Sequence, residues 1–303
     1  MKRGTLIGIS AGAAALVAIG GIVWIAANGP PPPEEGAEQY LAALSTGDYS
    51  QVEALLADDV EIDDETKAAF SNAVSYIEDY TFEVVPDASG AIGVKADVTL
   101  GGEPGVVFFG LWQQGGEWRV NADFLGTVQA ETTRGDSAVV GGVVVPASDP
   151  LAVFPAVYLV TAAPSYLLSG STEVAVTNES PTEVQITAEL TDAASVRALE
   201  VLDEYAVACT VAATSVPENC GFRIPWAAQL ATLDSVAFRI EEHPVVTLDA
   251  AASTFTATGG VVVATVTGTP RDGADASITY RIDNWILRGL YRFAGDEMLL
   301  DVG

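Results

Sequence analysis

The chain has 303 residues, of which 49% are hydrophobic, so it is long enough for two domains with cores of their own. It contains 41 acidic residues against 13 basic ones, a formal net charge of −28 at pH 7. A surface this acidic excludes nucleic acid as a partner, because phosphate contacts need a basic face.

The first expected element is a membrane-spanning helix. Residues 5–27 are 23 residues without a charge, and a helix of that length spans about 30 Å of hydrocarbon. Lys2 and Arg3 precede this run and every Asp and Glu follows it, which predicts a cytoplasmic N-terminus and an extracellular remainder. Residues 1–28 are therefore expected to be a cytoplasmic stub and a single-pass anchor in the cell membrane. Residues 29–36, with four consecutive prolines, are expected to be a stiff linker.

A cleaved signal peptide is the alternative for this segment. Its apolar core normally runs only about 7–15 residues, which is shorter than the run found here. A clear small-residue cleavage site is also lacking at residues 24–28, where the sequence reads WIAAN.

The uncharged run contains a Gly-x-Ser-x-Gly motif, formed by Gly8, Ser10 and Gly12. A nucleophile elbow needs a preceding strand and a histidine partner, and the only histidine, His243, lies 233 residues away. The motif is therefore not expected to be catalytic. Gly4, Gly8 and Gly12 instead recur at every fourth position on one helix face, where small residues let two membrane helices approach closely. The pattern favours helix packing, including a homodimer through this helix.

An α+β domain is expected over residues 37–127. Helical spacing of apolar residues predicts two short helices over 37–59, joined at Gly47-Asp48, and a third helix over 64–80. The pattern then changes to period two, as in antiparallel strands. Four strands are predicted, over residues 81–87, 91–100, 105–114 and 117–124.

This domain resembles the nuclear transport factor two-like (cystatin-like) cone fold. The resemblance rests on the opening AEQYLAALSTGDYSQVEALLADD and the closing hairpin GLWQQGGEWRV, and covers about residues 37–125. It is similar in particular to small versions on bacterial envelope proteins, including those that precede penicillin-binding transpeptidase domains. The transpeptidase motifs Ser-x-x-Lys and Lys-Thr-Gly are absent from the chain.

Aromatic residues of this domain either fill its core or line a ligand pocket, and we expect the core. They are Tyr40, Tyr76, Tyr80, Phe82, Phe108, Trp112 and Trp118.

Two further regions follow the first domain. Residues 128–190 show strands punctuated by Pro and Gly, which predicts a β-rich connector or small sandwich. Residues 191–303 return to helix then strands, which predicts a second α+β domain. Its expected helices cover 191–211 and 223–233, and its strands cover 235–249, 253–268, 276–293 and 297–302.

The second α+β domain contains a sequence pattern that is similar to one in the first. Gly289-Leu290-Tyr291 repeats the pattern of Gly110-Leu111-Trp112 at an offset of 179, which suggests a divergent duplication. The alternative is that any two hairpins with glycine turns look alike. This C-terminal part also resembles a recurring type of actinobacterial membrane-anchored protein.

Cys209 and Cys220 are the only cysteines. In an oxidising compartment such a pair predicts a disulfide, which would stabilise by roughly 3 kcal/mol in the chain-entropy model. Two free buried thiols are the alternative. A zinc site is not expected, because one histidine and two cysteines leave a ligand missing.

Residues 58–65 hold six carboxylates, but they lack the glycine and terminal glutamate of a calcium loop. A solvated loop is expected, in which Asp63 and Asp64 start the next helix, and a weak cation site is the alternative. His243, beside Glu241 and Glu242, is expected at the surface.

No catalytic, metal or cofactor site is predicted. The preferred function is a non-enzymatic, membrane-anchored binding or scaffolding protein that recognises an envelope protein or a cell-wall component. A small-ligand carrier or sensor with a cavity in a cone domain is the alternative. A hydrolase with dispersed carboxylates is a third hypothesis.

Overall fold

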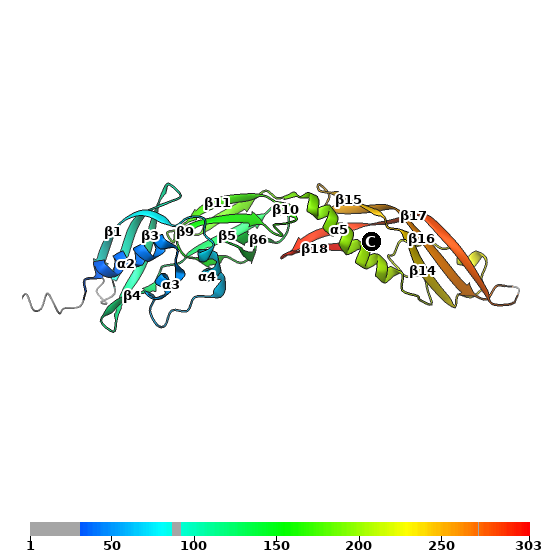
Figure 1. The fold of residues 1–303 in the computed structure, drawn as a ribbon, viewed down its shortest axis with the longest axis horizontal. Coiled ribbons are helices and arrows are strands. Elements are labelled where there is room, and N and C mark those ends of the chain that lie inside the picture. Colours follow the sequence, from blue (N-terminus) through cyan, green and yellow to red (C-terminus); the bar gives the residue numbers. More distant parts are fainter. Residues whose placement is uncertain (1–30, 87–91, 272) are drawn as a thin grey trace, which may run out of the picture. The chain divides into compact units, whose positions relative to one another are not determined.

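The computed structural model describes residues 31–86, 92–271 and 273–303 (Figure 1). These residues form a sheet-rich α+β protein, as the change between helical and period-two patterns predicts. The predicted anchor and the glycines Gly4, Gly8 and Gly12 lie outside the described residues. Among the helices that are described, none is long and apolar enough to span a membrane.

Two units make up the chain, and they are interleaved in sequence. The N-terminal unit contains residues 31–61 and Ile77–Phe124, and the second unit contains Ile62–Tyr76 and Leu125–Gly303. The chain therefore contributes a short segment to the second unit before it completes the first.

Helix α2 (Pro33–Thr46) begins inside the segment predicted to be a linker. Pro33 sits in the first turn, where its missing N–H is tolerated, and the following glutamates are favourable at a helix N-terminus. The helix ends at Gly47, whose φ of 70° is a left-handed conformation suited to glycine. Asp48 then caps α3 (Tyr49–Glu53) by accepting the N–H of Ser50. The predicted pair of short helices is confirmed.

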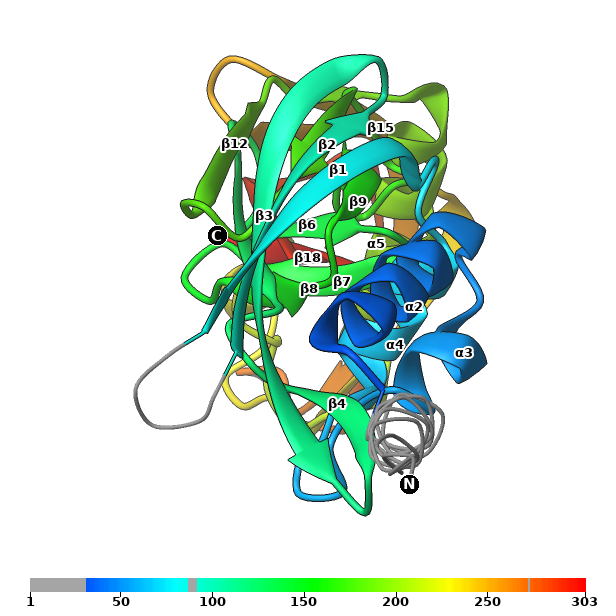
Figure 2. The same cartoon turned by 90° about the vertical axis from the view of Figure 1, so that its left-hand side faces the viewer.

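The sheet of the N-terminal unit is an antiparallel meander with the order β1-β2-β3-β4. Its side chains alternate: Val94, Ala96 and Val98 are buried, and the residues between them are exposed. The sheet curls around α2 (Figure 2). The four predicted strands are confirmed as β1 (Ile77–Pro86), β2 (Ile92–Leu100), β3 (Glu103–Gln114) and β4 (Glu117–Ala122).

The helix predicted over residues 64–80 is correct only for its first half, α4 (Asp64–Ser71). Beyond it the backbone pairs with Val157: the N–H of Val74 donates to the Val157 carbonyl at 2.8 Å, and the Val157 N–H donates to Ser75 at 2.9 Å. The β-branched and aromatic residues of this stretch favour extended structure once a partner strand is available. Helical spacing alone did not reveal that partner.

Helix α4 packs within the second unit. The hydroxyl of Thr66 donates to the carbonyl of Ala152 at 2.7 Å, and the ring of Phe70 lies 5.1 Å from that of Phe154. The predicted third helix of the first domain is therefore part of the core of the β-rich region.

Three small sheets form that β-rich region, with the orders β11-β9-β6-β7, β12-β5-β8 and β10-β13. β5 pairs with β12 in parallel, and the boundary predicted between residues 127 and 128 falls inside β5. Parallel neighbours are distant in sequence, so local patterns do not reveal them. The strands are β5 (Gly126–Thr132), β6 (Ser137–Val140), β7 (Val143–Pro146), β8 (Leu151–Val153), β9 (Ala156–Ala162), β10 (Leu168–Ser169), β11 (Ser171–Val176), β12 (Thr182–Ile186) and β13 (Glu189–Leu190).

Residues 191–303, which we call the C-terminal lobe, contain α5 (Asp192–Cys209) and an antiparallel sheet of order β14-β16-β17-β18, with β15 also paired to β16. The strand predicted over 235–249 is two strands, interrupted at Pro244, which cannot donate a ladder hydrogen bond. The second predicted helix is reduced to one 3-10 turn, Trp226–Ala228. The strands are β14 (Ser235–Glu242), β15 (Val245–Asp249), β16 (Thr254–Gly268), β17 (Ala276–Ala294) and β18 (Glu297–Val302).

Register shifts around Gly260 interrupt the ladder between β16 and β17. On β17 the inward-facing side chains accordingly change from even positions, such as Tyr280 and Ile282, to odd ones, such as Trp285 and Leu287. Bulges of this kind bend a sheet and redirect its side chains. The two halves of β17 therefore present different sets of residues.

The sequence similarity at offset 179 does not join structurally equivalent residues. The β3–β4 hairpin closes with Gln114 opposite Glu117, and the β17–β18 hairpin closes with Ala294 opposite Glu297, an offset of 180. At offset 179, Leu111, which is 1% exposed, would correspond to Leu290, which is 55% exposed. A slip of one residue moves every side chain to the opposite face of a sheet, so the residues matched at offset 179 do not occupy equivalent positions in the two hairpins.

Candidate functional site

The inner face of the N-terminal sheet is filled by its own helix. Tyr40, Leu41 and Leu44 of α2 are completely buried, and the Tyr40 ring lies 4.8 Å from that of Phe109 on β3. The Tyr40 hydroxyl has no hydrogen-bond partner within the described residues, and burial holds its pKa well above the usual range for tyrosine. This face is a hydrophobic core.

The other aromatic residues of the predicted first domain do not converge on one pocket. Tyr76 lies in the second unit and donates its hydroxyl to the carbonyl of Phe70 at 3.0 Å. Trp118 donates its ring N–H to the carbonyl of Pro31 at 2.8 Å. Trp112, which was expected in the core, is instead exposed on β3, so that prediction is wrong for this residue. These residues therefore serve separate local contacts.

The acidic run at residues 58–65 is divided between the two units. Asp58 accepts a hydrogen bond from the Gln114 amide at 2.8 Å in the N-terminal unit. Asp63 caps α4 in the second unit, and the N–H of Thr66 at 2.6 Å lowers the pKa of its carboxyl. The expectation that Asp63 starts a helix is confirmed. Among the described side chains, no group of three or more His, Cys, Asp or Glu residues is placed to hold a metal ion.

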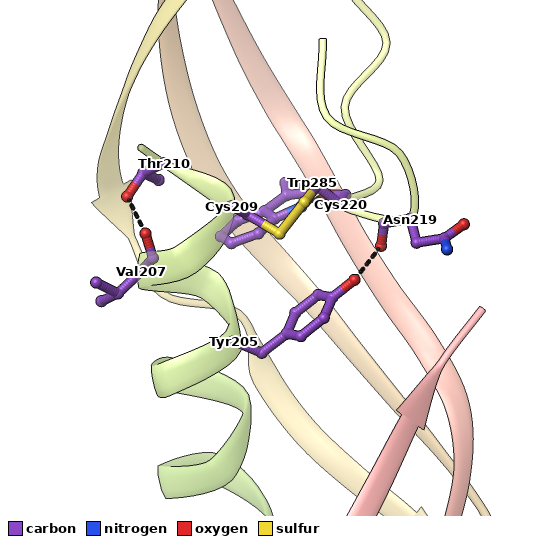
Figure 3. The surroundings of a disulfide bond; sticks show 7 residues. All are labelled: Tyr205, Val207, Cys209, Thr210, Asn219, Cys220 and Trp285. Atoms are coloured by element: carbon purple, nitrogen blue, oxygen red, sulfur yellow. Dashed lines mark hydrogen bonds between the residues drawn. A yellow bond between two sulfur atoms is a disulfide. The ribbon is translucent and has the colours of Figure 1, made fainter. Parts of the chain in front are cut away.

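The predicted disulfide joins Cys209 at the end of α5 to Cys220 (Figure 3). The ring of Trp285 is completely buried beside it and donates its N–H to the carbonyl of Cys220 at 2.7 Å. The hydroxyl of Tyr205 donates to the carbonyl of Asn219 at 3.0 Å. The disulfide thus anchors a loop that supplies core to the sheet, and neither cysteine is a free thiol.

His243 lies in the turn between β14 and β15, and its Nδ1 is 2.7 Å from Oδ1 of Asp203 on α5. Both side chains are about half exposed, at 49% and 41%. Within the described residues His243 makes no hydrogen bond to a serine or threonine hydroxyl. The pair therefore connects the helix to the sheet and lacks the nucleophile that a catalytic triad requires.

The outward face of the C-terminal sheet carries the most exposed apolar cluster of this lobe's strands. Val245, Ile286 and Leu290 are 71%, 45% and 55% exposed. Strand pairing places Thr247, Thr256 and Arg288 in one row across β15, β16 and β17. The next row consists of Asp249, Thr254, Leu290 and Asp301. We call Val245, Ile286, Arg288 and Leu290 the Arg288 patch.

A shallow hollow of about 490 Å³ adjoins this patch, and its lining includes Arg288, Leu290 and Asp301. Arg288 forms no ion pair within the described residues, although the chain is strongly acidic. Arg239 and Arg281 on the same sheet are held by Glu241, and Arg281 also by Asp283. A guanidinium beside exposed apolar side chains is suited to bind a carboxylate on an apolar partner surface.

A second hollow, of about 400 Å³, lies on the N-terminal sheet above the paired Gly93 and Gly110. Phe108 and Val85 line it, and its lysine, Lys95, is 3.5 Å from Asp97. Because its cation already has a carboxylate partner, this hollow is a weaker candidate than the Arg288 patch.

Sequence patterns had not singled out the Arg288 patch. Alternation on residues 286–292 marks the two faces of β17, but it does not show which neighbours leave Arg288 without a partner. The predicted disulfide pair is brought together, and the glycines Gly4, Gly8 and Gly12 lie outside the described residues. No family model matches the chain, and neither a curated protein nor a solved structure is similar to it at a significant level.

Proposed function

We propose that this chain is a non-enzymatic binding or scaffolding protein of the cell envelope, anchored in the membrane by residues 5–27, with its C-terminal domains extracellular. Its partner is an envelope protein or cell-wall component that carries a carboxylate beside an apolar surface. The Arg288 patch is the binding surface.

The observation that carries this proposal is the guanidinium of Arg288, which forms no ion pair among the residues that the structure describes and lies among exposed Val245, Ile286 and Leu290. Arginine is enriched among the residues that contribute most to binding at protein interfaces, and burial of exposed apolar side chains beside it also favours association. The envelope location rests on the uncharged N-terminal run, the cysteine pair and the resemblance to nuclear transport factor two-like envelope domains. The filled inner face of the N-terminal sheet favours surface binding over a ligand cavity.

The test is site-specific photo-crosslinking with the full chain in its membrane. A photoreactive amino acid at position 290 should give one discrete adduct, and the same residue at Val196, which is also exposed but lies on α5, should give none. The substitution Arg288→Glu should reduce the adduct at least about tenfold, since it places a carboxylate against the partner's carboxylate.

Arg223→Glu is the matched control, because Arg223 is exposed in the same lobe and forms no ion pair within the described residues. It should leave the adduct unchanged. Equal adducts at 290 and 196, or an adduct that survives Arg288→Glu, would contradict binding at this patch. A substrate turnover measured for the purified chain would contradict the non-enzymatic assignment.

A further inference from the structure

One strand edge in the C-terminal lobe is left open over a long stretch. β17 pairs with β16 from Ala276 to Leu290, but on its other side it pairs with β18 only from Gly289 to Ala294. No other backbone hydrogen bond within the described residues reaches residues 276–287. An open edge presents unpaired N–H and C=O groups that another strand can use.

Other edges of the molecule are closed by short segments. Val120 on β4 exchanges backbone hydrogen bonds with Leu55 and Ala57, at 2.8 and 2.9 Å. Val236 on β14 does the same with Ala213, at 2.7 and 3.0 Å. Such coverage is a common way to prevent edge pairing. The distal part of β17 has no equivalent cover among the described residues.

The edge of β1 is protected differently. It carries Glu78, Asp79 and Glu83, and like charges of this density repel an added strand. Residues 276–280 of β17 have no charge at all, and Arg281 is balanced by Asp283 at 2.6 Å. Within the described residues, this edge is therefore protected neither by a paired backbone segment nor by a cluster of like charges.

The inner side chains along this edge are incompletely covered. Ile278, Tyr280 and Ile282 are half-buried, whereas their cross-strand neighbours on β16 are completely buried. Those neighbours are Val266, Ala264 and Val262. Burial on the inner face of the sheet thus decreases from β16 to the edge strand β17. A further strand paired with β17 would bury these side chains more completely.

We propose that this edge, residues 277–283, pairs with the same edge of a second copy of the chain. In an antiparallel pair centred on Tyr280, Ile278 faces Ile282 of the other copy, and the two Tyr280 residues face one another. On the outer side Thr279 faces Arg281 of the other copy, and Ser277 faces Asp283. Every apolar inner residue meets an apolar one and no like charges are opposed, so the edge is self-complementary about a two-fold axis.

The test compares a negative with a positive charge at position 279. The Thr279 side chain is exposed, so the fold should accommodate either substitution. The full chain, kept in detergent because of its uncharged N-terminal run, is examined by sedimentation over a range of concentrations. Thr279→Glu places two carboxylates opposite two arginines and should tighten the dimer about fivefold to tenfold. Thr279→Lys opposes like charges and should weaken it by a similar factor.

Thr172 on β11 is also exposed, and Thr172→Glu and Thr172→Lys should leave the dissociation constant of the dimer unchanged. The register is tested by Tyr280→Cys, since the native cysteines are both in the disulfide and the new thiol is the sole free one within the described residues. It should form an intermolecular disulfide, and Ser277→Cys should not. A monomer at every concentration, a dimer indifferent to both Thr279 variants, or equal cross-linking at 277 and 280 would overturn the proposal.

Discussion

The N-terminal unit and the C-terminal lobe each pack one helix on an antiparallel sheet, and they fill the space between helix and sheet differently. Helix α2 buries Tyr40, Leu41 and Leu44 against its sheet, so the helix itself supplies the large side chains. Helix α5 buries only one large side chain, Leu202, and its other buried residues are Ala194, Ala198, Ala206 and Cys209.

In the C-terminal lobe, a loop supplies a large side chain that fills the core between helix and sheet. Phe222 stacks on Phe238 with ring centroids 4.4 Å apart, and it lies 5.4 Å from Trp285. A loop has fewer internal hydrogen bonds than a helix and loses more entropy when it is fixed, so a covalent bond at its start is useful. In this chain the disulfide stabilises the core that a loop completes, whereas the core that a helix fills contains no cysteine.

The largest expected effect is on the helix-made core. Leu44→Ala should lower the free energy of unfolding by about 2–5 kcal/mol, because Leu44 is completely buried and its removal leaves a cavity. Val207→Ala on α5 is the control, since its side chain is 60% exposed, and it should change stability by less than about 0.5 kcal/mol. Calorimetry of the full chain measures both, and equal losses would contradict the contrast.

Removal of the disulfide should act on the loop-made core alone. Cys209→Ala combined with Cys220→Ala should cost about 3 kcal/mol, because the unfolded chain regains the entropy of an open loop between positions 11 residues apart. In calorimetry only the transition of the second unit should move. Reductant should reproduce the shift in the native chain and have no effect on the double variant. A shift in the N-terminal unit would count against this assignment.

Tyr40→Phe should stabilise the N-terminal unit, by about 1 kcal/mol. The hydroxyl is buried without a partner in the described residues, so its removal abolishes an uncompensated desolvation cost. Chemical denaturation followed by tyrosine and tryptophan fluorescence measures the change. A loss of stability would show that the hydroxyl has a partner.

The smallest expected effect is a pH dependence of the second unit. Asp136 accepts the N–H of Gly295 at 2.9 Å, and this hydrogen bond lowers the pKa of its carboxyl. Because the folded-state pKa is depressed, the contribution is present above the ordinary aspartate pKa of about 4 and is lost as pH falls through the folded-state pKa.

Asp136→Asn should therefore flatten the acid side of the stability profile, measured by unfolding between neutral and acidic pH. Asp296→Asn is the control, since Asp296 adjoins Gly295 and accepts no hydrogen bond within the described residues. An identical acid profile in Asp136→Asn and the native chain would contradict this role.

Local patterns were sufficient for most elements. The pair of short helices, the long helix at 192–209, the four strands of the N-terminal unit and the cysteine pair all follow from spacing within about 20 residues. Local patterns gave a wrong prediction where the secondary structure of a segment depended on pairing with a strand far away in the sequence. The helix predicted to residue 80 ends at Ser71 because Val157, far along the chain, pairs with the segment that follows.

The sequence by itself determined the acidic surface, the uncharged N-terminal run, the α+β class and the disulfide partners, because each depends on composition or on neighbours in the chain. Only the tertiary structure decided that α4 belongs to the second unit and that, within the described part of the chain, Arg288 forms no ion pair and the distal edge of β17 has no paired strand. These features depend on which distant residues cover a face or an edge. Coverage is a property of packing between segments, and local periodicity reports only which side of a strand is apolar.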